Sequence, residues 1–202
     1  MTAPVAMVTD FRILLPPGWA RIPLDSRAPL RVKNLVTERV GAVPAPQRAE
    51  LRAWLTRELT AALESAARQG GIDVLLSVDP VAGRPVPASG LVTHVRSPGG
   101  SSALEGLLGS LRSSGKGVRE LGLVDVAGAP AVRRLSSRQE MVPDANGVRS
   151  GELTVTQVDY FVPVPGSDGW LLLTFTTPVE HLASPLVKLF DVIGGSLRWV
   201  LS

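Results

Sequence analysis

The feature that most limits the fold is a run of four strand-like segments between residues 119 and 177, joined by short connections. Each connection contains glycine or proline, and the second contains Asn146-Gly147, a pair typical of tight hairpins. Connections this short can only join antiparallel neighbours. The four segments are Arg119–Val126, Ala131–Val142, Glu152–Val164 and Trp170–Thr177. The sequence therefore predicts an antiparallel meander in this half of the chain.

Three further strands are expected earlier in the chain, over residues 8–15, 72–78 and 86–96. The last two are joined by a short connection rich in proline and glycine, which again favours antiparallel pairing. A bulge is expected near Gly90. A second bulge, near Gln157, would explain why the apolar positions of the strand over 152–164 change phase from Leu153 and Val155 to Val158 and Tyr160.

Four helices are expected, three between these strands and one after the last of them. The clearest covers residues 46–69, because its leucines recur at three- and four-residue steps and Gly70-Gly71 follows. Such a helix could bind a membrane surface or a partner, or simply cover one face of a sheet, which is the commoner arrangement. The other helices are expected over 27–40, over 103–112, and near the end of the chain with Ser184 as N-cap and Pro185 at the first helical position.

The element order is thus β-α-α-β-β-α-β-β-β-β-α. This order predicts an α+β fold, a mainly antiparallel sheet flanked by helices, formed by residues 1–202 as one domain. The tandem glycines Gly194-Gly195 inside the last helix are unfavourable there. They indicate close approach of this helix to the sheet.

The charge balance is nearly even, with 21 basic and 18 acidic residues. The pI near 9.9 follows from this small excess, because few groups titrate at high pH. We therefore expect no nucleic-acid partner. No apolar run approaches the ~20 residues that span a bilayer, so no membrane span is expected. The first residues lack the pattern of a secretory signal, and a cytoplasmic location is the resulting expectation.

The residues carry no recognisable catalytic or cofactor motif. Cysteine is absent and there are only two histidines, His94 and His181. Gly99-Gly100-Ser101-Ser102 resembles a phosphate cradle, but Ser102 and Glu105 have the spacing of a helix capping box. Ser167 lies in a connection that reads as a hairpin loop, outside the context of a serine hydrolase. We therefore expect no catalytic residue, no metal and no cofactor.

The strongest local basic feature is a group of arginines on one predicted strand: Arg133, Arg134 and Arg138, with Arg149 just beyond. Arg134 and Arg138 share a face by the two-residue period of a strand. The three could bind an acidic partner, or they could be a solvated sheet face or protection for a sheet edge.

Two segments resemble PsbP-like domains. Phe11-Arg12-Ile13-Leu14-Leu15-Pro16-Pro17-Gly18-Trp19 is similar to their opening strand and Pro-Gly-Trp turn. The strand at Trp170–Thr177, Pro178 and a helix that ends Phe190-Asp191-Val192-Ile193-Gly194-Gly195-Ser196-Leu197-Arg198 are similar to their close. The resemblance implies an α/β/α sandwich and a class that mostly binds proteins, including photosystem subunits, nuclear-transport cofactors, lipoproteins and secretion chaperones. Residues 70–88 also resemble small actinobacterial proteins found in secretion-related contexts.

From these observations we expect a non-enzymatic cytoplasmic module that binds a protein, as a chaperone or accessory factor of a secretion system. It would cover an apolar segment of its partner with the sheet face or a helix groove. Two alternatives remain open: an immunity-type protein that inhibits a toxin, and a small-molecule binder or hydrolase with a pocket between sheet and helices. A homo-oligomer is also compatible with the sequence.

Overall fold

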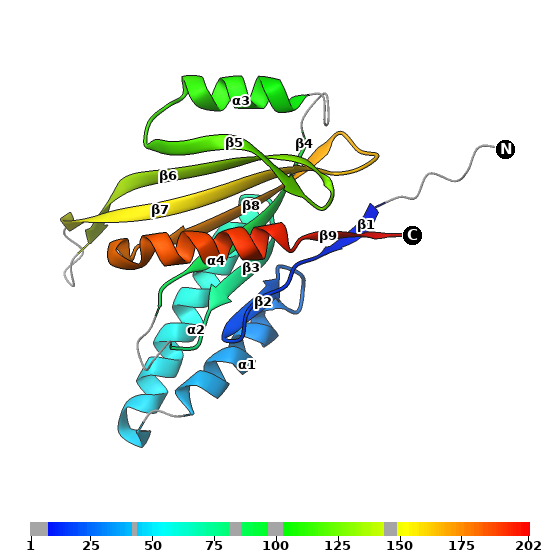
Figure 1. Ribbon diagram of the computed structural model, residues 1–202. Helices are drawn as coiled ribbons and strands as arrows, with labels where there is room; N and C mark the ends of the chain where they lie inside the picture. The colour runs from blue at the N-terminus through cyan, green and yellow to red at the C-terminus, as the bar shows by residue number, and fades with distance from the viewer. Residues whose placement is uncertain (1–7, 42–43, 81–85, 97–102, 144–148) are drawn as a thin grey trace.

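The computed structural model describes residues 8–41, 44–80, 86–96, 103–143 and 149–202 (Figure 1). The helices are α1 (Ala28–Val40), α2 (Ala45–Arg68), α3 (Leu104–Ser113) and α4 (Ala183–Gly195), the last preceded by a short 3-10 turn, η2 (Glu180–Leu182). The strands are β1 (Val8–Arg12), β2 (Trp19–Pro23), β3 (Gly71–Ser77), β4 (Ser89–Arg96), β5 (Val118–Val126), β6 (Ala129–Pro143), β7 (Arg149–Pro163), β8 (Gly169–Thr177) and β9 (Arg198–Leu201).

Seven strands form one sheet in the order β2-β3-β4-β8-β7-β6-β5, and every neighbouring pair is antiparallel. The predicted meander is β5 to β8. It joins the earlier strands where β8 pairs with β4 over eight residues, from Ser89 with Thr176 to Arg96 with Gly169. Strands β1 and β9 form a separate two-stranded sheet. The α+β class with a mainly antiparallel sheet is confirmed.

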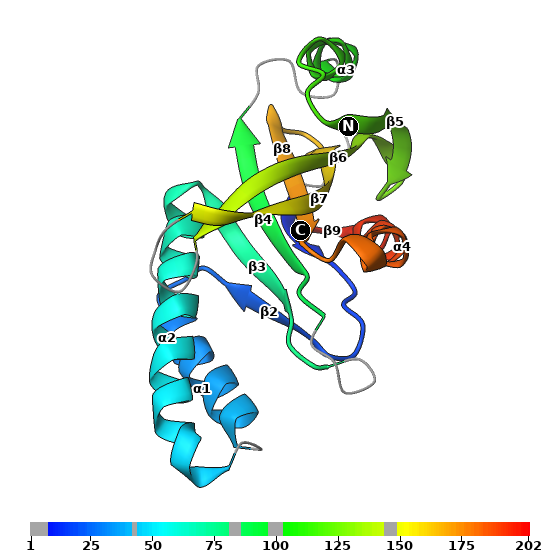
Figure 2. The same ribbon diagram turned by 90° about the vertical axis from the view of Figure 1, so that its left-hand side faces the viewer.

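Alternation along the strands gives the sheet two different faces. On one face, here called the α4 face, Leu75, Val92 and Phe175 pack with residues of α4. On the other, the α2 face, Val74 and Leu76 pack with residues of α1 and α2. Figure 2 shows α2 and α4 on opposite sides of the sheet. The helices thus cover both faces, as a layered α+β domain requires.

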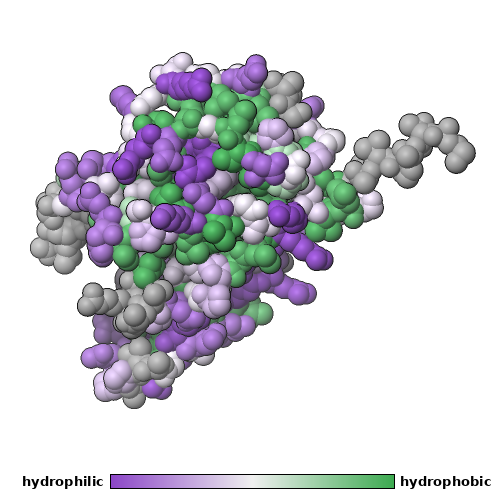
Figure 3. All heavy atoms as spheres, viewed as in Figure 1, coloured by the Kyte–Doolittle hydropathy of each residue, from purple (hydrophilic) through white to green (hydrophobic). Residues whose placement is uncertain are grey.

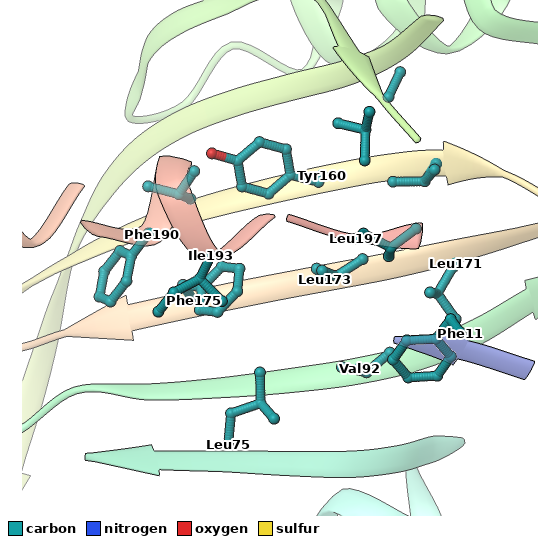
Figure 4. Packing of buried hydrophobic residues seen from close by; sticks show 14 of the residues in the cluster. Phe11, Leu75, Val92, Tyr160, Leu171, Leu173, Phe175, Phe190, Ile193 and Leu197 are labelled. Atoms are coloured by element: carbon teal, nitrogen blue, oxygen red, sulfur yellow. The ribbon is translucent and has the colours of Figure 1, made fainter. Parts of the chain in front are cut away.

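The main core lies under α4 (Figure 4). The ring of Phe190, from α4, stacks on that of Phe175, from β8, with 5.2 Å between centroids. Gly194 lies directly against the ring of Tyr160, since a Cβ at this position would come 2.8 Å from it. The expected close approach of α4 to the sheet is therefore confirmed at Gly194. Gly195 has nothing within 4 Å of such an atom.

Helices α1 and α2 form an antiparallel hairpin beside the sheet (Figure 1). Helix α1 buries Ala28, Val32, Val36 and Val40, whereas Leu63 is the one residue of the described part of α2 in the buried core. The leucines of α2 at positions 51, 55 and 59 pack partly against this second cluster. Helix α2 therefore covers the sheet only in part and leaves much of its length exposed.

Several sequence expectations were wrong in detail. The structure has two short strands, β2 and β9, that the sequence does not predict, and β9 begins at Arg198, where the sequence predicts the end of the last helix. Helix α4 begins at Ala183 with Leu182 as N-cap, so Ser184 and Pro185 lie inside its first turn. The connections over 81–85 and 144–147 and the Ser102–Glu105 capping box depend on residues outside the described part of the chain.

Neither predicted bulge is present. Strand β4 pairs without interruption through Gly90, and the register shift with β3 falls between Gly71 and Asp73 instead. Gly90 serves a different purpose, because a Cβ there would lie 3.0 Å from the ring of Phe175. Strand β7 pairs regularly through Gln157. Val155 and Val158 therefore lie on opposite faces of the sheet, which accounts for the change of phase.

No helix in the described part of the chain is both long and apolar enough to cross a membrane.

Candidate binding groove

A groove lies between α2 and the α2 face of the sheet, with a cavity volume of about 580 Å³. One wall is the sheet-facing side of α2, which contributes Leu59, Ala62, Leu63, Ala66 and Gln69. The floor crosses the centre of the sheet. Its residues come from β3 (Val74, Leu76), β4 (Ser89, Gly90, Leu91, Thr93, Val95), β6 (Arg138), β7 (Gln157) and β8 (Leu172, Thr174, Thr176). We call this the α2–sheet groove.

The groove exists because α2 covers only part of one face of the sheet. Residues of one cross-strand row, Val74, Leu91 and Thr174, all project to the α2 face. Helix α2 reaches only the first strands of the row, and the floor beyond them stays open. Leucines, alanines and valines supply nine of the seventeen lining residues, so the groove presents mainly apolar surface.

Several polar side chains of the floor have hydrogen-bond partners within the sheet. The hydroxyl groups of Ser89 and Thr176 form a hydrogen bond of 3.0 Å. The Thr174 hydroxyl donates to Oδ1 of Asp159 at 2.7 Å, and the amide nitrogen of Gln157 donates to the same carboxylate. Because these groups already have partners, recognition in the groove would depend on shape and apolar contact more than on polar pairing.

Two of the three predicted arginines lie on the α2 face. Arg134 donates two hydrogen bonds to Oδ2 of Asp159, at 2.9 and 2.6 Å, and its guanidinium lies 5.9 Å from the ring of Phe161. Arg138 pairs with Glu140 at 2.6 Å, donates to Gln157 and lines the groove. The expected shared face of Arg134 and Arg138 is thus present. Both cations are matched by carboxylates of the same chain.

Arg133 projects to the opposite, α4 face. Its Nε and Nη2 donate to the two carboxylate oxygens of Asp191 at 2.7 and 3.1 Å, and its Nη1 donates to Glu120 at 2.8 Å. Asp191 also accepts a hydrogen bond from the Tyr160 hydroxyl. This group ties α4 to the sheet. The three arginines therefore do not form one basic patch, and their role in binding an acidic partner stays a prediction.

Tyr160 provides a test of the Asp191 group, because it is the single tyrosine of the chain. Burial and the hydrogen bond to Asp191 raise its pKa above the ordinary value of 10.0. The phenol binds its proton more tightly when folded. Its contribution to stability is therefore complete below pH 10 and is lost as the pH rises through the folded-state pKa.

We expect the tyrosinate absorbance of the folded protein to appear only above pH 10, and to return to an ordinary titration in denaturant. Asp191→Asn, which removes the negative charge, should lower the folded-state pKa. An ordinary titration of the folded wild-type protein would contradict the burial and hydrogen bonding described for Tyr160.

A second cavity, of about 560 Å³, lies on the α4 face beside Arg133 and Asp191. Its lining mixes three cations with three carboxylates: Arg119, Arg133, Lys188, Glu120, Glu180 and Asp191. Arg133, Glu120 and Asp191 are already paired with one another. Half of the charged side chains in this cavity are therefore engaged within the chain and do not point to one kind of ligand.

The residues considered for catalysis lie apart from both cavities. His94 and His181 are exposed, and neither belongs to the lining described for the two cavities. Ser167 accepts a hydrogen bond from the backbone N–H of Gly169 at 2.9 Å, within the turn that joins β7 to β8. This is the expected hairpin loop. Among the described residues no group of three or more metal-binding side chains gathers at one place.

Sequence reasoning did not find Asp159, Gln157 or the inner side of α2. Asp159 stands between Val158 and Tyr160 on a strand, which is a signal that it lies on the other face from them. Its partner Arg134 is 25 residues away in the chain. The pairing of these two could be deduced only with the register of β6 against β7.

Fold and groove together define an α+β domain with a seven-stranded antiparallel sheet, helices on both faces and an apolar groove on one of them. No protein-family model matches the chain, and no curated protein matches it.

The solved structures similar to it include the following two. LpqN of Mycobacterium tuberculosis, described as involved in cell envelope biogenesis, is 15% identical with a TM-score of 0.49, over 94% of this chain and 83% of that one. The cyanobacterial PsbP (CyanoP) of Synechocystis is 10% identical with a TM-score of 0.42, over 94% of this chain and 86% of that one. A PsbP is among the solved structures to which the chain is similar. The likeness concerns the fold alone.

Proposed function

We propose that this protein is a non-enzymatic module that binds an apolar segment of a partner protein in the α2–sheet groove. The observation that carries this proposal is the groove itself, an open apolar channel at the centre of the sheet beside a helix that buries little of its own surface. Exposed apolar surface rimmed by polar residues is typical of sites that bind other proteins.

The polar groups of the groove support binding over chemistry. A general base or nucleophile needs a free, activated group within reach of a substrate. In the described lining the Ser89, Thr174 and Thr176 hydroxyls are held in internal hydrogen bonds, and Asp159 beneath them is paired with Arg134. These contacts stabilise the floor. The leucines and alanines are therefore the side chains that would contact a ligand.

Helix α2 allows a sharp test, since Ala61 and Ala62 are adjacent, exposed and on different sides of it. Ala62 lines the groove, whereas Ala61 lines a surface that α2 shares with Lys33 of α1. Tryptophan at position 62 would fill the groove. Tryptophan at position 61 adds the same apolar side chain elsewhere and is the matched control.

We expect wild-type protein and Ala61→Trp to capture the same protein from the native cell extract, and Ala62→Trp to bind it at least about tenfold more weakly, a loss of ~1.4 kcal/mol. The purified partner, titrated by calorimetry, gives the affinities. Equal binding by both variants would show that the partner does not bind in the groove. The absence of any reproducible partner would count against protein binding as a whole.

The identity of the partner separates the finer hypotheses. A secreted client would support a cytoplasmic chaperone or accessory factor of a secretion system, and a toxin whose activity is lost in the complex would support the immunity-type alternative. The groove volume of about 580 Å³ also lies within the range of small-molecule sites, roughly 300–1,000 Å³. Native mass spectrometry of the purified protein tests this second candidate. A bound compound displaced in Ala62→Trp and kept in Ala61→Trp would favour it.

A further inference from the structure

The strands that form the described floor of the α2–sheet groove are all inner strands of the sheet. They are β3, β4, β8, β7 and β6, and each is hydrogen-bonded to a neighbour on both sides. The backbone N–H and C=O groups of these strands are therefore used within the sheet. A ligand in the groove cannot join the sheet as a further strand, which is the usual way in which a sheet binds an extended peptide.

The side chains of the floor also offer few partners to an extended backbone. Ser89, Thr174, Thr176 and Gln157 already take part in hydrogen bonds within the sheet. An extended segment on this surface would bury backbone N–H and C=O groups without partners, at a cost in binding free energy. A helix satisfies these groups within itself, except at its ends. The floor therefore favours a helical ligand.

The wall of the groove has the pattern of a helix face that packs against another helix. Leu59, Ala62, Leu63 and Ala66 of α2 line the groove, at the i, i+3, i+4, i+7 spacing of one helix face. The distance between packed helices depends on the side chains at the contact, and alanines allow a close approach. The wall therefore suits a second helix beside α2.

The width of the floor leaves room for one such helix. Helix α2 packs on β3, and β8 is the second strand beyond β3 in the sheet. Neighbouring strands are about 4.8 Å apart, so β8 is about 10 Å from β3. The axes of packed helices are about 8–10 Å apart. A helix above β8 would therefore lie at the normal packing distance from α2.

The opposite face of the sheet carries a helix at the corresponding position. Helix α4 contacts β7 and β8 there and lies across the middle of the sheet (Figure 1). In the same view, hydrophobic and hydrophilic residues are intermixed on the surface (Figure 3). On the α2 face, Leu172, Thr174 and Thr176 of β8 instead line the open groove. A bound helix would complete the second layer at this place.

Charge complementarity adds an acidic group to this description of the ligand. Arg138 is the one charged residue among the described residues that line the groove. It projects from β6, which of the lining strands lies farthest from β3, and its side chain is half exposed. Its partner Glu140 lies outside the described lining, and an exposed pair of this kind is weak. A carboxylate on the side of the ligand away from α2 would therefore contact a cation.

We propose that the segment bound in the α2–sheet groove is an amphipathic helix of the partner protein, whose apolar stripe is bordered by acidic side chains on the side next to Arg138. The helix lies over β8, between α2 and Arg138. This ligand is a narrower case of the proposed function and rests on it. Apolar contact supplies most of the affinity, and Arg138 selects which border of the stripe is acidic.

A library of random peptides displayed on phage, selected on the immobilised wild-type protein, tests this choice of ligand. We expect the enriched peptides to carry apolar residues at three- and four-residue steps, with Asp or Glu along one border of the stripe. A selected peptide, made synthetically, should become helical on binding, as measured by circular dichroism. Proline at its centre should weaken binding by at least about tenfold. Enriched peptides with apolar residues at every second position would overturn the proposal.

Arg138→Glu tests the charge. It should weaken binding of the selected acidic peptide by about tenfold and should favour a version of that peptide with lysine at the acidic positions. Arg57→Glu is the matched control, because Arg57 is also an exposed arginine paired with a glutamate but lies on the outer surface of α2. Wild-type affinity in Arg138→Glu, or an equal loss in both variants, would overturn the proposal.

The pair of variants Ala62→Trp and Ala61→Trp separates this proposal from the proposed function. The selected peptides should lose binding in Ala62→Trp and keep it in Ala61→Trp. If Ala62→Trp weakens binding of the native partner but of no selected peptide, the groove keeps its proposed function and the helical ligand is wrong. If Ala62→Trp weakens neither, both proposals are wrong. Circular dichroism of each variant confirms that it is folded.

Discussion

Replacing Asp159 with alanine is expected to lower the free energy of unfolding by about 3 kcal/mol or more, because it leaves a partly buried guanidinium without its partner. The Asp159 side chain is 1% exposed and accepts hydrogen bonds from Arg134, Gln157 and Thr174. All three donors lose their acceptor in Asp159→Ala. Urea denaturation followed by tryptophan fluorescence measures the loss.

The matched control for this prediction is Glu140→Ala. It removes the carboxylate from Arg138, on the same strand, but both side chains of that pair are about half exposed, at 50% and 45%. An exposed pair contributes about 0–1 kcal/mol. The double variant Arg134→Met/Asp159→Leu removes both charges together and should recover most of the stability. If Asp159→Ala and Glu140→Ala lower the free energy of unfolding by the same amount, the burial of Asp159 does not make the loss of its carboxylate more costly.

The second large effect is expected from adding one methyl group to Gly194. The new Cβ would lie 2.8 Å from the ring of Tyr160, and this ring cannot turn aside easily because its hydroxyl donates to Asp191 on the same helix. Overpacking of this kind costs about 1–3 kcal/mol. Thermal and urea unfolding of Gly194→Ala should show a loss within that range.

Gly195 is the natural control, since it belongs to the same helix and has open space around its missing side chain. Gly195→Ala should be neutral or should stabilise the protein by up to about 1 kcal/mol, because alanine favours helix more than glycine does. The contrast between neighbouring positions matters more than either value. Equal effects at both positions would mean that α4 does not contact β7 as closely as described.

The elements that were predicted correctly are those with long periodic patterns or clear turns. Helix α2 was found from its leucine spacing, and strands β5 to β8 from alternation between glycine- and proline-containing connections. Strand β2 was missed because five residues after Pro-Pro-Gly, with Arg21 at the centre and Pro23 at the end, carry no strand signal of their own. It forms because Arg21 pairs with the buried Asp73 and Ile22 packs under α1.

Strand β9 shows the same limit at the other end of the chain. Its four residues begin shortly after α4 and carry no strand signal of their own, and only their pairing with β1 makes them a strand. Both predicted bulges failed for a related reason. Gly90 and the phase change around Gln157 reflect packing on two covered faces of the sheet, and a single sequence does not show which face each side chain meets.

From the sequence, the binding site could be predicted only in general terms, as a sheet face or a helix groove. Its wall comes from α2, and its floor comes from strands distant in the chain, including β4 and β8. The arginines were visible as a cluster, but their acidic partners lie on three other elements or at other strand positions. Asp191 of α4 lies 58 residues from Arg133. Local pattern cannot give such pairings, because they depend on the register of strands and the placement of the helix.

The pairing of β4 with β8 also affects how the chain reaches this structure. Within each half of the large sheet the paired strands are consecutive, whereas the seam between the halves joins residues such as Ser89 and Thr176, which are 87 positions apart. Bringing such distant segments together costs entropy before any contact compensates for it. We therefore expect the two halves to form early and their docking along this seam to limit the rate of folding. The floor of the groove, which crosses the seam, would be completed last.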